Sequence, residues 1–140
     1  MRLEGFIIKP DGKKNKYWHI EVPALDVASQ GKSKADAYLM IKDAIEVTAD
    51  TEGFKIEVIP GEGLSFTVRS DDTRTLVAFM LKRQRVSHEL TLQEMAKRLK
   101  INSPNAYARY EQGKTAPTVE KLLELLKAID PKAEPVLRVG

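Results

Sequence analysis

Apolar and polar residues repeat with two different periods along the chain, and the change between them falls near residue 70. In the first part, the run from Tyr17 to Val22 alternates in steps of two, with Trp18, Ile20 and Val22 on one face. This spacing is typical of a half-buried strand, whereas the steps of three and four after residue 73 are typical of helices. The pattern predicts an α+β chain with a small N-terminal sheet and one packed helix, followed by an all-α C-terminal domain.

Residues 1–70 are predicted to form three strands, a helix and one or two further strands. The helix should begin after Ser33, because Ser33 and Asp36 have the spacing of a capping box, and should continue through about Thr48. A helix covering one face of a small sheet buries the apolar side of both. Strands are expected at residues 3–8, 17–22, 27–30, 54–59 and 64–69, and the apolar helix positions are Ala37, Met40, Ile41, Ala44, Ile45 and Val47.

Residues 73–133 predict short helices joined by tight turns, after a polar linker at residues 70–72. The pair Thr91 and Glu94 forms a capping box, so one helix should begin at Leu92. Ser103 and Pro104 suit the start of the next helix, and Gly113 suits its end. The expected core positions are Leu76, Phe79, Met80, Met95, Ala96, Leu99, Ile101, Tyr107, Tyr110, Leu122, Leu123, Leu125, Leu126 and Ile129.

This order of helices is that of a helix-turn-helix, in which the second helix of the motif enters the DNA major groove. The helix that starts at Ser103 therefore supplies the candidate base contacts, Asn105, Ala106 and Arg109. Asparagine can pair with adenine, and arginine can pair with guanine or contact a phosphate. The candidate phosphate contacts, which position the protein without reading sequence, are Gln93, Lys97, Ser103 and Lys114.

Charge is divided unequally between the two parts of this 140-residue chain. Residues 1–72 carry 10 lysines and arginines against 13 acidic residues, and residues 73–140 carry 13 against 7. A basic half suits DNA, and a mildly acidic half requires another role. The chain has no cysteine and no apolar run near the roughly 18 residues that span a membrane. We expect a soluble, cytoplasmic protein without a cofactor.

Catalytic chemistry is not expected. The carboxylates Asp26, Asp36, Asp43 and Glu46 have the residue type of a two-metal nuclease, but Asp36 is interpreted as a helix cap. Asp43 and Glu46 are interpreted as a solvated helix face. His19 and His88 lack an acidic partner at ligand spacing, so we expect no metal site and no enzyme.

The segment from about Thr73 to Pro131 resembles the Cro/XRE family of phage-repressor helix-turn-helix proteins. The resemblance rests on the string RYEQGKTAP and on Ala96, Leu99, Ile101, Tyr110, Glu111, Gly113 and Pro117. The chain departs from the family at Leu92, where glutamine is common, and at Lys100, where glycine is common. The turn around Ser103 is also expected to be one residue longer.

The first domain resembles the HicB antitoxins, through the string YWHIEVPALDVASQGKSKADAYLMIKDAIE. The resemblance implies a degenerate RNase H-like module that binds HicA, a small basic mRNA-cleaving toxin, while the second domain represses the operon. It points to toxin-binding residues near the second and third strands, namely His19, Glu21, Asp26 and Gln30. Trp18 is either a core residue, which we favour, or an anchor of that interface.

Two functions share the DNA-binding half: an antitoxin, and a plain repressor whose first domain dimerises or binds a ligand. A metal-dependent nuclease is a distant third. DNA binding should require a homo-oligomer, a dimer or a tetramer, because a symmetric dimer reads two half-sites. The tail at residues 134–140 is either an edge strand joining two subunits or a disordered end.

Overall fold

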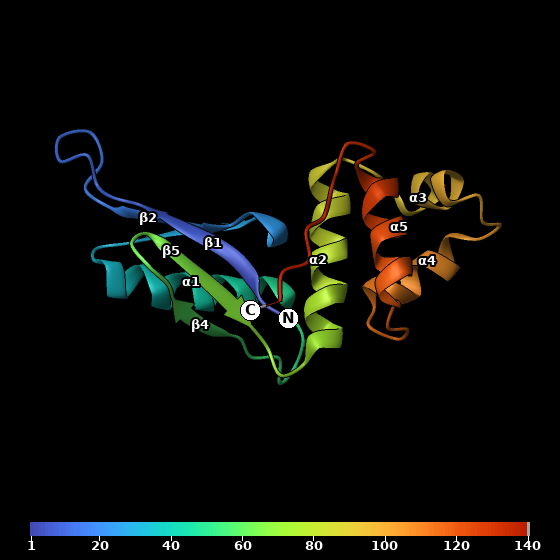
Figure 1. Cartoon of the computed structure of the whole chain (residues 1–140), viewed down its shortest axis with the longest axis horizontal. Coiled ribbons are helices and arrows are strands. Elements are labelled where there is room, and N and C mark those ends of the chain that lie inside the picture. Colours follow the sequence, from blue (N-terminus) through green and yellow to red (C-terminus); the bar gives the residue numbers. More distant parts are fainter. Residues whose placement is uncertain (140) are drawn as a thin grey trace. The chain divides into compact units, whose positions relative to one another are not determined.

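The computed structural model describes residues 1–139 and contains two compact units, Met1–Leu76 and Val77–Gly140 (Figure 1). We call them the N-terminal and C-terminal domains. The helix α2, Thr73–Ser87, begins in the first unit and continues into the second. In the part of the chain that the structure describes, no helix is long and apolar enough to cross a membrane.

The N-terminal domain contains one antiparallel sheet in the order β3-β2-β1-β5-β4. Three strands precede the helix α1 and two follow it, as predicted. Pro23 ends β2, and the short 3-10 helix η1, Pro23–Leu25, leads into β3. The strands are β1 Leu3–Ile8, β2 Trp18–Val22, β3 Val27–Gly31, β4 Glu57–Pro60 and β5 Ser65–Arg69.

The helix α1, Lys34–Ala49, covers one face of this sheet and packs on β2 and β3. Ser33 caps it by accepting a hydrogen bond from the Asp36 N–H at 3.0 Å. The Asp36 carboxylate accepts from Lys32 N–H rather than from Ser33, so the cap is related to a capping box but not identical to one. The domain core consists of Ile7, Ile20, Val22, Leu25, Ala37, Ile41, Ile45, Phe66 and Val68.

Gly31 lets α1 approach β3 closely. A Cβ atom at Gly31 would lie 2.4 Å from the Ala37 backbone nitrogen, well inside van der Waals contact. Only a residue without a side chain fits between this strand and the helix backbone, so Gly31 positions the start of α1 on the sheet.

One prediction for this domain is wrong in detail. The strand expected at residues 54–59 begins only at Glu57, because Ile56 N–H bonds to the Glu46 carboxylate of α1 instead of a neighbouring strand. Met40 and Val47, two of the apolar positions that recur along α1, are 41% and 68% exposed. They lie on a flank of α1 that the sheet does not cover.

The C-terminal domain consists of α2, α3 Leu92–Leu99, α4 Pro104–Glu111 and α5 Val119–Ile129. Its core is formed by Val77, Leu81, Leu90, Met95, Tyr107, Leu125 and Ile129. Leu123, expected in the core, is exposed, since it points away from the α5 face that carries Leu125 and Ile129. Residues 133–139 form neither helix nor strand, and Gly140 lies outside the described residues.

Candidate nucleic-acid interface

Side-chain caps set the boundaries of the helices around the turn. Thr91 and Glu94 form both hydrogen bonds of a capping box at the start of α3. The Ser103 hydroxyl accepts from Asn105 N–H at the start of α4, where Pro104 needs no donor. Gly113, with a φ of 70°, ends the turn after α4. Each of these roles was predicted from the sequence.

Lys100 ends α3 in a left-handed conformation with a φ of 57°. This backbone region favours glycine, which explains why glycine is common at this position in the family that the segment resembles. Lys100 places an exposed cation at the turn between α3 and α4.

A buried ion pair connects α2 to the end of α4. The Arg85 Nε lies 2.8 Å from the Glu111 Oε1, and the two side chains are 13% and 6% exposed. Arg85 also donates from Nη1 to the Leu90 carbonyl at 2.6 Å, so one guanidinium joins α2, α4 and the loop before α3. The pair fixes the position of α4 in the domain. Sequence analysis found Glu111 only as part of a motif and missed Arg85.

The Tyr107 side chain is fully buried, and its hydroxyl interacts with Arg85 and Glu111 of the ion pair. Burial raises the pKa of Tyr107 well above its ordinary value, and the negative charge of Glu111 raises it further. Tyr107 therefore remains neutral, and its ring anchors the inner face of α4.

The outer face of α4 carries all three candidate base contacts. Asn105, Ala106 and Arg109 are exposed, while Tyr107 and Ala108 between them are buried. The helix therefore presents an amide, a methyl group and a guanidinium on one accessible surface.

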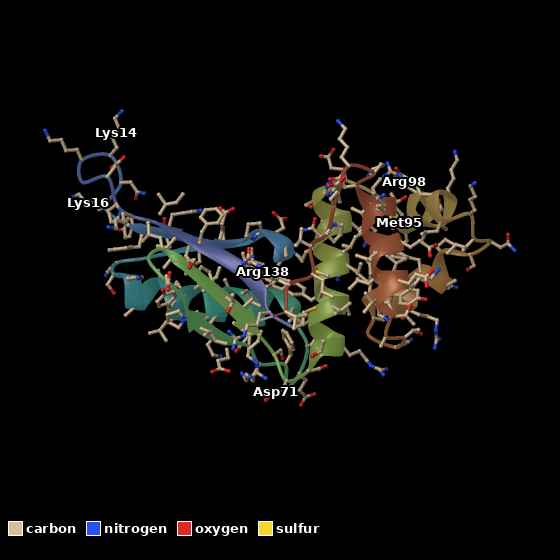
Figure 2. The ribbon with its side chains drawn as sticks, viewed as in Figure 1. Lys14, Lys16, Asp71, Met95, Arg98 and Arg138 are labelled. Atoms are coloured by element: carbon tan, nitrogen blue, oxygen red, sulfur yellow. The ribbon has the colours of Figure 1, made fainter. Side chains whose placement is uncertain are left out.

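The candidate phosphate contacts surround this face. Gln93 and Lys97 are exposed on α3, and Lys114 is exposed just after α4, where its N–H donates to the Arg109 carbonyl. The Ser103 hydroxyl is half-buried and serves as the helix cap. Arg98, beside Lys97, is different: it donates to the carbonyls of Ala128 and Ile129 at the end of α5 (Figure 2).

Three of the residues proposed to bind a toxin gather on one side of the N-terminal domain. His19 and Glu21 lie on the sheet face opposite α1, with the His19 Nε2 2.9 Å from the Glu21 Oε2, and Gln30 pairs with His19 across β2 and β3. Asp26 lies apart, in a left-handed conformation after η1. Trp18 is half-buried on the α1 side of the sheet. Ile20 and Val22, on the same side, are fully buried.

Each histidine has one acidic neighbour in the structure. Besides the His19–Glu21 pair, which joins two residues on the same side of a strand, the His88 Nε2 lies 3.8 Å from the Asp130 carboxylate. The second contact joins distant parts of the sequence. Neither pair belongs to a larger cluster, since residues 1–139 contain no group of three or more potential metal ligands.

The interpretation of Glu46 as part of a solvated helix face is also wrong. Its side chain is only 14% exposed and binds Lys42, Lys55 and the Ile56 N–H. Burial alone would raise its pKa, but these hydrogen bonds outweigh burial and hold the pKa of Glu46 below its ordinary value. Glu46 attaches the loop before β4 to α1. Asp43 is exposed, and Asp36 is a cap, as expected.

Comparison with known proteins identifies the C-terminal domain. Residues 81–132 match a family model described as helix-turn-helix, which is of the Cro/XRE type. A match of this kind is typical of DNA-binding transcription regulators and suggests double-stranded DNA as the partner of this domain. The match does not extend into the N-terminal domain, and no curated protein matches the chain.

Proposed function

We propose that this protein is an antitoxin of a HicAB-like toxin–antitoxin system. Its C-terminal domain represses the protein's own operon, and its N-terminal domain sequesters a small basic mRNA-cleaving toxin. The DNA-binding half of this proposal is supported by α4, which is held by the Arg85–Glu111 pair and exposes Asn105 and Arg109. Neither half requires a catalytic group, so the protein acts by binding.

Operator recognition follows from the geometry of α4. With its N-terminal half in the major groove, Asn105 would pair with adenine, Arg109 with guanine and the Ala106 methyl with thymine. Gln93, Lys97, Ser103 and Lys114 would contact phosphates, which sets the register of the protein on the duplex. Two copies would read half-sites separated by about one helical turn, roughly 34–36 Å.

The Arg109→Ala substitution tests the DNA-binding half. We expect its affinity for the DNA upstream of its own gene to fall by about 10- to 100-fold, since a bidentate base contact contributes roughly 1–3 kcal/mol. Fluorescence anisotropy at a fixed salt concentration measures the loss. Lys127→Ala is the matched control, because Lys127 is an exposed cation in the last turn of α5. Equal affinity of the Arg109→Ala variant and the wild type would refute the assignment of α4 as the recognition helix.

The toxin-binding half is supported by charge and by the face that carries His19, Glu21 and Gln30. A basic RNA-binding toxin would be attracted to an acidic domain, and such complementarity mainly increases the association rate and the selectivity. The resemblance to HicB antitoxins covers this same stretch of β2, β3 and α1.

Co-expression with the neighbouring genes tests this half. We expect a small basic protein to copurify at fixed stoichiometry and Glu21→Lys to weaken that complex. Glu52→Lys is the matched control, since Glu52 is an exposed acid beyond α1. If the protein binds its own promoter but no such protein copurifies, the plain repressor is correct, and the N-terminal domain serves dimerisation or ligand sensing.

A further inference from the structure

The backbone groups at the β3 edge of the sheet are unpaired, and their direction follows from the hydrogen-bond pattern. The Ile7 N–H donates to the Leu64 carbonyl at 2.9 Å, so Ile7 turns its polar groups toward β5. Residues along an antiparallel strand turn alternately to the two sides, so Phe6 and Ile8 bond to β2, and Ile20 bonds to β3. The N–H and carbonyl groups of Ala28 and Gln30 therefore point outward from the edge strand.

The β4 edge at the other end of the sheet is different. The Gly61 N–H donates to the Ser65 carbonyl at 3.0 Å, so Ser65 and Thr67 turn toward β4, and Val58 and Pro60 turn outward. Proline has no N–H, so this short edge can offer a donor only at Val58. Proline is one of the devices that protect an edge strand from pairing with another chain. β3 contains neither proline nor a charged residue.

The flank of α1 beside the β3 edge is apolar. On the opposite flank, the Tyr38 ring packs edge-to-face on Phe66 of β5, and Glu46 binds the segment before β4. Met40, Ala44 and Val47 follow one another at steps of four and three and lie on the flank toward β3. Val47 is 68% exposed and Met40 is 41% exposed, so residues 1–139 leave much of this strip uncovered.

We infer that two copies of this protein dimerise through their β3 edges, antiparallel about a two-fold axis at Ser29. In that register, Ala28 lies opposite Gln30 of the second copy, and their outward N–H and carbonyl groups satisfy each other. The two sheets become one continuous sheet, and the α1 strips approach each other above it.

The proposed repressor needs to be a dimer in order to bind its operator, and pairing through the β3 edges would provide that dimer. The inference goes beyond the proposed function because it rests on the geometry of the N-terminal domain alone. Sizing the protein without DNA therefore tests it independently of the helix-turn-helix.

Sedimentation velocity over a concentration series tests the dimer with the full chain. We expect a wild-type mass of twice 15.7 kDa. Ala28→Pro removes an outward N–H that the single copy does not use, as Pro60 does in β4, and should weaken dimerisation by at least about tenfold. Val47→Lys should weaken it comparably by placing charge in the α1 strip. Circular dichroism verifies that both variants fold.

Leu39→Lys is the matched control. Leu39 is as exposed as Val47, at 67%, but lies on the side of α1 away from both the sheet and the strip, so this variant should dimerise like the wild type. A monomeric wild type would overturn the inference and leave the edge to another chain. Dimerisation that survives both Ala28→Pro and Val47→Lys would overturn it as well, since it would place the interface elsewhere.

Discussion

In the C-terminal domain, an ion pair between Arg85 and Glu111 holds α4 against α2, whereas in the N-terminal domain α1 rests directly on β3 above Gly31. The first device joins two charged side chains that must both be present. The second depends on the absence of a side chain. Both helices are thus positioned by contacts between different elements, but a contact made by two charged side chains and one made by a missing side chain respond differently to mutation.

The largest expected effect comes from breaking the ion pair. Arg85→Met leaves the Glu111 carboxylate buried without its partner, which should destabilise the C-terminal domain by about 3–5 kcal/mol. Urea unfolding followed by circular dichroism measures the loss, and operator binding should disappear with it. In the double variant Arg85→Met/Glu111→Leu, stability should return close to that of the wild type. A single variant as stable as the wild type would show that the pair does not position α4.

A smaller effect is expected from filling the space at Gly31. Gly31→Ala forces α1 away from β3, and overpacking of this kind costs about 1–3 kcal/mol. Thermal unfolding compares this variant with Lys32→Ala at the next, exposed position, which should be nearly neutral. No second substitution on a side chain can repair the Gly31 variant, because the clash involves the backbone of Ala37. Unchanged stability of Gly31→Ala would mean that the helix can shift on the sheet without cost.

The smallest effect concerns Glu46 and depends on pH. Since its folded-state pKa is lowered, the carboxylate stabilises the N-terminal domain above the unfolded-state pKa, and this contribution is lost as the pH falls through the folded-state pKa. Glu46→Gln should therefore flatten the decline of stability below about pH 5. Urea midpoints of the two proteins between neutral pH and acid measure the difference. Parallel pH profiles would show that Glu46 contributes no charge-dependent stability.

Local signals in the sequence predicted the starts of α1, α3 and α4, because Ser33, Thr91 and Ser103 act on backbone groups only two or three residues away. The exposure of Asn105 and Arg109 followed from the same helical periodicity. Whether these side chains contact DNA, and whether His19 and Gln30 contact a toxin, stays a prediction.

Contacts between distant residues were not predictable in the same way. Arg85 and Glu111 are separated by two helices and two turns, and nothing in the spacing of either residue identifies its partner. The late start of β4 has a similar cause, since the apolar residues Phe54 and Ile56 suggest a strand, while a carboxylate from α1 takes the Ile56 N–H. Periodicity identifies which side chains are buried, but not which backbone groups find a partner in the sheet.

Pro60 bears on how far the proposed assembly could grow. A sheet that could add a strand at both ends would allow copies to join in a row without limit, as in a fibril. Once two β3 strands have paired, the outer ends of the joined sheet are both β4, where Pro60 offers no donor to a further chain. In the proposed dimer, each outer edge would therefore offer a single donor, at Val58, and would be a poorer template for a further strand than β3.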